Sequence, residues 1–447
     1  MRLIILLIAL SCLMAVTSAS IWHALQFPDL PLRPKWIAVM ALLHIWPMIP
    51  ALALIWRWSR KRLFGILLLW SVVFLIVGTW RSSEEAGPLG MLALLVIECG
   101  VALALMSLVF LGNATRAIAP WLLMPAAVLV LSVFIGIDAL MYMAMHESPL
   151  LKSLVALLEW LPGRSGIFVV FAIFVLLSSI IAWWPMRMLG RALGRAYSRK
   201  WLSDLLAVFT GVWAFALTDR ALTLSSTAGA KALAIYLPLL WIPIVMLLAR
   251  RGWQPGRAPT LLVLRVFQRD KEVQSLFDQV IERWRLSGNT VMIAGTDLAD
   301  RTLDATGIFE FLDRRLAERF VVSPTDVARR IAAFDEAADI DGRYRVNECY
   351  CHDTTWQDAL EALMHHSDVV LMDLRSFQTR NAGSRYELTK LAETSRELRV
   401  VALTDSQTDR TAANEAIASG RKERFTWIEA SSLNASKRRE VMACLFA

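Results

Sequence analysis

The sequence contains few cysteines, and their spacing does not favour a zinc site. Five of the 447 residues are Cys, and Cys349 and Cys351 flank Tyr350 without a second cysteine pair or suitably spaced histidines. A structural zinc site needs four ligands in such groups, so no metal site is predicted. The adjacent His365 and His366 lie beside an expected strand and are interpreted as surface or capping residues.

Charged residues are also scarce. They make up only 19% of the chain, whereas hydrophobic residues make up 56% and the mean hydropathy is +0.49. Residues 1–258 carry nearly continuous apolar runs of about 17 to 25 residues, the length that crosses a hydrocarbon core of roughly 30 Å. No such run occurs after Pro259. We therefore expect a multi-pass transmembrane domain over residues 1–257 and a cytoplasmic domain over residues 258–447.

The apolar runs predict eight membrane-spanning helices, near residues 3–23, 36–56, 63–80, 89–111, 119–143, 165–185, 202–218 and 232–249. The connections on one side, together with Arg2, hold 14 Lys or Arg residues; the alternate connections, which include Asp219 and Arg220, hold seven. By the positive-inside rule, we expect both ends of the chain to lie in the cytoplasm and the helices to cross a bacterial-type inner membrane. A cleaved signal peptide is the alternative interpretation of the first run, whose apolar core ends in small residues.

The net charge of +8 does not indicate a nucleic-acid partner. Residues 1–258 hold 21 basic and 9 acidic residues, whereas residues 259–447 hold 26 basic and 30 acidic residues. The basic excess therefore sets membrane topology or faces anionic lipid headgroups. A mildly acidic C-terminal domain does not suit binding to a phosphate backbone.

Two carboxylates, Glu98 and Asp138, lie inside predicted spans, where a charge is expensive and usually faces a partner or a cavity. They could mark a proton or solute path, or each could be protonated or hydrogen-bonded between helices. The sequence shows no paired intramembrane cation, no clear inverted repeat and no broken helix rich in Gly and Pro. Transport is therefore the third-ranked function.

After residue 258, short apolar runs alternate with amphipathic helical patterns, which is typical of a mostly parallel α/β sheet with helices on its faces. Strands are predicted near residues 261–267, 290–295, 344–351, 368–374, 400–405 and 425–430. Helices are predicted near residues 270–287, 307–321, 326–338, 354–367, 382–398 and 436–446. In such sheets ligands bind beyond the carboxyl ends of the strands. Glu387, in the helix after strand 368–374, belongs to that region.

The segment Ser384-Arg385-Tyr386-Glu387-Leu388 resembles the segment that bears the glutamate of Toll/interleukin-1 receptor (TIR) domains. The run LLVLRVFQRDKEV is similar to the opening of such domains and of the nucleoside deoxyribosyltransferase-like group. The resemblance covers roughly residues 260–405 and implies a flavodoxin/TIR-like fold. The chain departs from the pattern in the extra stretch 305–342 and in Ser384, where a Cys is often found.

Catalytic TIR-like domains cleave the nicotinamide–ribose bond of NAD, so the resemblance implies an NAD glycohydrolase with Glu387 as its catalytic residue and NAD as substrate rather than cofactor. A carboxylate can stabilise the oxocarbenium-like charge that builds on the ribose. This role requires an ionised acid, for which an ordinary pKa is adequate. The alternative interpretation is a first-turn acid stabilised by the helix dipole.

Six other residues are candidates for nucleotide binding. Phe267 and Gln268 could line the base pocket, Asp373 could orient the sugar, and Ser384 lies near a helix start that favours phosphate. Arg375 and Arg385 are candidate pyrophosphate partners. Asp373 could instead simply end a strand, and the two arginines could be solvated.

Together these patterns predict a multi-pass inner-membrane protein that carries a TIR-like nucleotide-binding domain, acting as an NAD-consuming signalling or defence effector. Homo-oligomers are expected, because tethering concentrates the domains. A non-catalytic protein that senses a nucleotide or a partner is the alternative.

Overall fold

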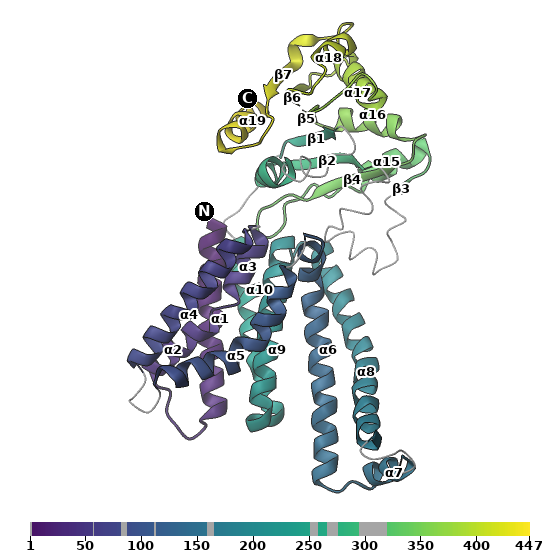
Figure 1. Cartoon of the computed structure of the whole chain (residues 1–447). Helices are drawn as coiled ribbons and strands as arrows, with labels where there is room; N and C mark the ends of the chain where they lie inside the picture. The colour runs from purple at the N-terminus through teal and green to yellow at the C-terminus, as the bar shows by residue number, and fades with distance from the viewer. Residues whose placement is uncertain are drawn as a thin grey trace. The chain divides into compact units, whose positions relative to one another are not determined.

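The computed structural model describes residues 2–56, 58–81, 87–110, 113–158, 165–250, 258–265, 276–294 and 320–447. The chain divides into two compact units, Met1–Arg251 and Gly252–Ala447 (Figure 1).

The first unit is helical, and seven of its helical segments are long and apolar enough to cross a membrane. Its elements are α1 (Arg2–Gln26), α2 (Pro34–His44), α3 (Met48–Ile55), α4 (Arg60–Arg81), α5 (Pro88–Val109), α6 (Asn113–Met145), α7 (Pro149–Leu157), α8 (Ser165–Ser198), α9 (Asp204–Ala228), the 3₁₀-helix η1 (Gly229–Leu240) and α10 (Trp241–Arg250). Helix α9 packs against α1, α3, α5 and α6. It is buried along most of its length, as expected of a helix at the centre of a bundle.

The seventh and eighth predicted spans lie in one helical segment, Asp204–Leu248, which folds back on itself. Residues 18 apart in a straight helix would be about 27 Å apart. The hydroxyls of Thr218 and Tyr236 nevertheless form a 2.7 Å hydrogen bond. The chain therefore reverses between α9 and η1, and Gly229 lies at the junction with a φ of +54°, a conformation that favours glycine.

This reversal places the end of α10 near the start of α1. Thr227 donates a hydrogen bond to the side chain of Gln26 at the C-terminal end of α1. Further along the chain, the indole of Trp241 donates to Thr17, about 13 Å nearer the N-terminus of α1. The chain after α9 thus runs antiparallel to α1, so both ends of this unit lie on the same side.

Two features of this unit differ from expectation. The predicted second span, 36–56, is broken between His44 and Met48, and Pro47 lies in the break. The predicted seventh span ends too early, because α9 continues to Ala228. Arg220, expected in a connection, is therefore only 1% exposed inside the bundle.

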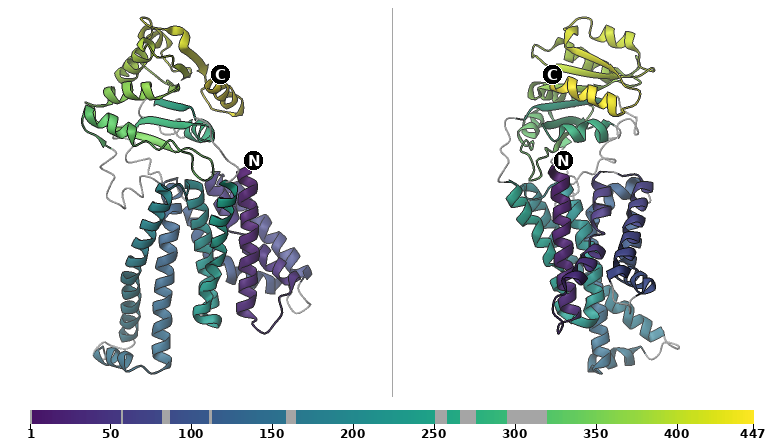
Figure 2. Two further views of the ribbon diagram at one scale, coloured as in Figure 1. Left: turned by 180° about the vertical axis from the view of Figure 1, so that it is seen from behind. Right: turned by 90° about the vertical axis from the view of Figure 1, so that its left-hand side faces the viewer.

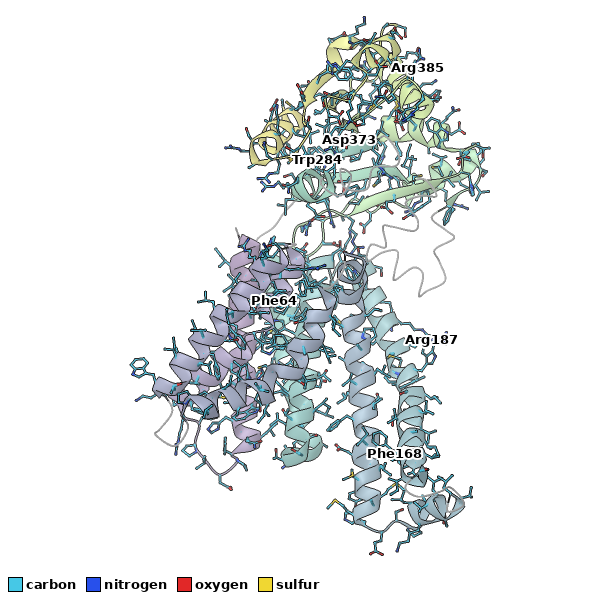
Figure 3. All side chains as sticks on the ribbon, viewed as in Figure 1. Phe64, Phe168, Arg187, Trp284, Asp373 and Arg385 are labelled. Carbon is cyan, nitrogen blue, oxygen red and sulfur yellow. The ribbon has the colours of Figure 1, made fainter. Side chains whose placement is uncertain are left out.

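Large apolar side chains cover the outer surface of the helical unit. Phe64 on α4 and Phe168 on α8, both labelled in Figure 3, are 49% and 71% exposed, and Leu68 and Trp80 on α4 are 68% and 76% exposed. A water-soluble protein rarely exposes apolar surface on this scale. The pattern indicates a membrane protein.

The second unit is built on a seven-stranded parallel sheet. Its strands are β1 (Thr260–Arg265), β2 (Asn289–Ala294), β3 (Phe320–Val321), β4 (Val346–Cys351), β5 (Val369–Asp373), β6 (Arg399–Thr404) and β7 (Phe425–Glu429). Its helical elements are the π-helical turn η2 (Phe277–Ile281), α12 (Glu282–Trp284), α15 (Pro324–Ala332), α16 (Trp356–His366), α17 (Ala382–Glu393), α18 (Arg410–Ala416), the 3₁₀ turn η4 (Lys422–Arg424) and α19 (Ala435–Phe446).

Helices cover both faces of this sheet (Figure 2). Alternate residues of β1 show the two faces: Leu262 and Leu264 pack with residues of α15 to α18, whereas Leu261 and Val263 pack with residues of η2, α12 and α19. This alternation follows from the two-residue period of a strand. Strands buried on both faces read as continuous apolar runs, which is why the sequence reveals them.

The strand order is β3-β4-β2-β1-β5-β6-β7. If the two-residue edge strand β3 is set aside, the order by appearance is 3-2-1-4-5-6, the order of doubly wound dinucleotide-binding sheets. The flavodoxin-like order that the resemblance implied is 2-1-3-4-5. The parallel α/β sheet is thus as expected. Strands β2-β1-β5-β6-β7 also run in the flavodoxin order, with β4 and β3 added at the edge beside β2, so the seven-stranded order contains both patterns.

Local differences from the predicted elements are small. The first strand is described over Thr260–Arg265, and the last two residues of the predicted strand, 266 and 267, lie outside the described residues. Most of the helix expected over residues 307–321 lies outside the described residues, and its last two residues, Phe320 and Val321, pair with β4 as strand β3.

Candidate functional site

The candidate site lies where β1 and β5 end side by side. These neighbours are parallel, and Arg265 at the end of β1 pairs in register with Asp373 at the end of β5. From β1 the chain continues to β2 on one side, whereas β5 lies on the other side of β1. Such a reversal of strand order opens a ligand-binding crevice at the carboxyl edge of doubly wound sheets.

Helix α17 follows β5 and brings Glu387 to this region. Ser384, Glu387, Leu388 and Leu391 are all buried, at the spacing of one helix face. Glu387 therefore occupies a position on the core-facing stripe where an apolar residue would be expected. It is only 4% exposed, and its Oε2 atom has no hydrogen-bond partner in the described part of the chain. A buried acid without a full set of partners is costly, which favours a functional role over a structural one.

Burial raises the pKa of Glu387 to about 8, and the nearby Arg265 guanidinium offsets the rise only in part. An ordinary pKa would be adequate for the catalytic role, but desolvation disfavours the charged carboxylate and raises the pKa above that value. The alternative of a first-turn acid stabilised by the helix dipole fails, since helix dipoles lower such pKa values and Glu387 lies in the second turn of α17. Near neutral pH Glu387 is therefore mostly protonated.

Asp373 and Arg375 form a buried pair at the end of β5. The Nε atom of Arg375 donates to Oδ1 of Asp373 at 2.8 Å, and its Nη2 atom donates to Oδ2. Both residues are less than 5% exposed. Arg375 is therefore not solvated, and its guanidinium fork is held by Asp373 rather than presented to solvent. Asp373 does more than end a strand, since it fixes this cation beneath the site.

The remaining predicted residues lie in different surroundings. Ser384 is buried one turn before Glu387, on the same face of α17. Arg385 is exposed at the periphery of this helix, whereas Asp373 lies within the sheet (Figure 3). Phe267 and Gln268 lie outside the described residues. The structure thus brings Asp373, Arg375, Ser384 and Glu387 to one edge of the sheet and directs Arg385 elsewhere.

Three residues that the sequence did not single out belong to the same edge. Arg265 is the charged residue of an otherwise apolar strand, and it is 6% exposed. Ser376, after β5, has a φ of +60°, a strained value for a non-glycine residue. Its backbone N–H and hydroxyl both donate to Asp405, which follows β6. An isolated charge at the end of an apolar strand was the available signal for Arg265 and Asp405.

Asp405 is held ionised by its neighbours. Burial works to raise the pKa of Asp405, but hydrogen bonds from Ser376 and Thr408 outweigh it, so the pKa lies below its usual range. Glu387 and Asp405 thus have opposite protonation at neutral pH. The ionised carboxylate of Asp405 orders the loop after β5 through its hydrogen bonds with Ser376. The protonated carboxyl of Glu387 can donate a hydrogen bond to a ligand or lose its proton when a ligand binds.

The sequence between β1 and Gly288 contains no glycine. Dinucleotide-binding sheets of this order commonly place a Gly-rich turn after the first strand, so that the backbone approaches the pyrophosphate. A nucleotide at this edge would therefore be held by side chains rather than by such a turn.

No protein-family model, curated protein or solved structure matches this chain. The resemblance to TIR domains therefore stays a prediction that depends on the quoted residues.

Proposed function

We propose that this chain is a multi-pass inner-membrane protein whose C-terminal domain, in the cytoplasm, binds a nucleotide at the carboxyl edge of its sheet and hydrolyses NAD. The observation that carries the proposal is Glu387, a buried acid with a raised pKa beside Arg265, at the point where the strand order reverses. Perturbed acids with a specific charge partner cluster at functional sites.

The membrane placement is supported by the seven long apolar segments and by the exposed apolar side chains of the helical unit. The basic residues of its connections favour a cytoplasmic location for both ends. The reversal at Gly229 supports an even number of crossings, because it returns the chain toward the start of α1.

The chemistry follows from the protonation of Glu387. The nicotinamide ring of NAD is cationic, and a cation placed beside a buried carboxyl favours loss of its proton. The resulting carboxylate stabilises the positive charge that develops at C1′ as the bond to nicotinamide breaks. Water then adds to C1′ and loses a proton, which yields nicotinamide, ADP-ribose and one proton.

The test is nicotinamide release from NAD by the full-length protein in detergent or nanodiscs, at high protein density. Glu387→Ala should lower the rate on the order of 100-fold or more, as expected when a group that stabilises charge is removed. Glu393→Gln is the matched control, because this acid is exposed on the same helix and should leave the rate unchanged. Equal rates for wild type and Glu387→Ala would refute the catalytic assignment.

A non-catalytic sensor of nucleotides is the second candidate, favoured by the missing Gly-rich turn and by the engagement of Arg375 with Asp373. Calorimetry separates the two functions. Tight binding of NAD or ADP-ribose without turnover would support the sensor. If neither nucleotide binds, a protein partner becomes the better hypothesis.

A further inference from the structure

A second group of titratable residues lies inside the helical unit, where α5 and α9 meet. Arg220 on α9 interacts electrostatically with Glu98 and Cys99 on α5 and with its neighbour Asp219. Arg220 is 1% exposed and Glu98 is 6% exposed. These side chains bring one cation and two acids into the interior of an apolar bundle.

Several of their polar atoms are buried without a hydrogen-bond partner among the described residues. They are Nη1 and Nη2 of Arg220, Oε2 of Glu98 and Oδ2 of Asp219. A structural ion pair would be expected to satisfy these atoms, since a buried unpaired group costs several kcal/mol. The arrangement is therefore not a closed salt bridge, and it keeps donors and acceptors for an exchanging partner.

The break between α2 and α3 supplies an independent sign of a site. His44, the last residue of α2, is fully buried and senses the charge of Arg220. Its Nδ1 atom bonds Ser18 at 2.9 Å, and its Nε2 atom has no partner in the described ranges. Broken helices in membrane transporters line the binding site for ions or substrate near the middle of the bilayer.

The depth of these residues agrees with such a site. The apolar segments Pro34–Ile55 and Pro88–Val109 each contain 22 residues. His44 and Glu98 both lie at their midpoints, about 15 Å from either end. If these segments cross the membrane as proposed above, both residues lie near its midplane.

The charges of the group require a proton. Arg220 carries one positive charge, whereas ionised Glu98 and Asp219 would carry two negative charges. A net charge near the bilayer centre is strongly disfavoured. Neutrality is reached when the two carboxyls share one proton. Cys99 and His44, two other ionisable residues that interact with Arg220, are both buried.

We propose that Glu98, Asp219 and Arg220, with His44 at the helix break, form a proton-transfer site through which the helical unit carries protons across the membrane. A carboxyl of the pair releases its proton toward one side and the carboxylate takes up a proton from the other. Arg220 keeps the vacated carboxylate stable between the two steps. No oxidant or co-reactant is needed.

The first test uses the full-length protein in liposomes that contain a pH-sensitive dye, with a potassium gradient and valinomycin to set the membrane potential. We expect proton entry above that of protein-free liposomes, and at least about tenfold slower entry with Glu98→Gln or Asp219→Asn. Asp138→Asn is the matched control, since this acid lies in α6 but is exposed. Entry no faster than in protein-free liposomes, or unchanged in both variants, would overturn the proposal, as would a flux that requires Na⁺.

A second measurement reads the shared proton directly. Infrared spectra of the Glu387→Gln protein, from which one protonated acid has been removed, should show a protonated carboxyl near neutral pH. That band should disappear when Glu98→Gln or Asp219→Asn is added. Absence of the band in the Glu387→Gln protein would show both acids ionised and reject the site. The site rests on the proposed membrane placement, which carbonate extraction of membranes tests separately.

Discussion

Replacing Glu387 with glutamine should stabilise the C-terminal domain. The side chains are nearly the same size, but glutamine cannot ionise. The pKa of Glu387 rises from 4.5 to about 8 on folding. Each unit corresponds to about 1.4 kcal/mol, so ionising this acid in the folded domain costs about 5 kcal/mol relative to the unfolded chain.

The sign of the pH dependence follows from proton uptake. Between about pH 4.5 and 8 the folded domain keeps the proton that the unfolded chain has lost, so folding takes up a proton and the free energy of unfolding falls as pH rises. Relative to wild type, Glu387→Gln should gain about 3 kcal/mol at pH 7 and about 5 kcal/mol above pH 8. Below about pH 4.5 this difference disappears, because both states are then protonated.

Urea unfolding of residues 252–447, one of the two compact units, measures this difference by tryptophan fluorescence and circular dichroism. Wild type, Glu387→Gln and Glu393→Gln should be compared at about pH 4, 7 and 9, so that the other titrating groups cancel. Glu393→Gln should differ from wild type by less than about 0.5 kcal/mol, as exposed substitutions usually do. If Glu387→Gln is no more stable than wild type at the highest pH, burial does not raise the pKa of Glu387 and the basis of the site is lost.

Three further outcomes follow from the same unit. If the domain hydrolyses NAD, kcat/KM for nicotinamide release should rise with pH and level off above about pH 8, because the ionised form of Glu387 is the active one; a rate that falls over this range would assign it the role of acid. Arg375→Ala should lower the free energy of unfolding by about 3–5 kcal/mol in urea titrations, because it leaves the buried Asp373 carboxylate without its cation; Asp373→Asn added to it should recover part of the loss, and full additivity would contradict the pair. Gly420→Ala should cost about 1–3 kcal/mol in the same titrations, because the added Cβ would lie 2.4 Å from the backbone of Ala392 in α17; a neutral effect would show that the turn containing Gly420 can move away from α17 freely.

The raised pKa of Glu387 also bears on the choice between enzyme and sensor. Both the enzyme and the sensor need a group whose protonation state changes when a ligand binds. A carboxyl that is neutral in the empty site and ionised beside a cationic ligand meets that need, and it links nucleotide binding to proton release. Proton release on NAD binding would be expected of both functions, whereas nicotinamide release would be expected of the enzyme only.

Local pattern was enough to locate most elements of the second unit. The strands over Val369–Asp373 and Arg399–Thr404 are short apolar runs next to turn residues, and α16 and α17 carry apolar residues at helical spacing. These are properties of neighbouring residues, so they can be recognised without knowing the fold. The same holds for the apolar segments of the first unit, because a span is recognised from its length and composition.

Where those elements lie relative to one another could not be recognised in this way. The pairing of Arg265 with Asp373 depends on β5 joining the sheet beside β1, which is set by packing between residues more than 100 positions apart. The pKa of Glu387 depends on its burial by segments distant in sequence, and the sequence alone favoured an ionised acid.

Arg220 illustrates the same limit in the helical unit. Its charge ends an apolar run, so hydropathy assigns it to a connection. Only the packed bundle shows that α9 continues past Arg220. It also shows that Glu98, on α5, is close enough for its carboxyl to interact electrostatically with the buried guanidinium of Arg220. Periodicity and composition are properties of neighbouring residues along the chain, whereas burial and charge pairing arise between segments that are distant in sequence. The chemistry of the Glu387 site and of the Arg220 site depends on burial and charge pairing, so only the tertiary structure determines it.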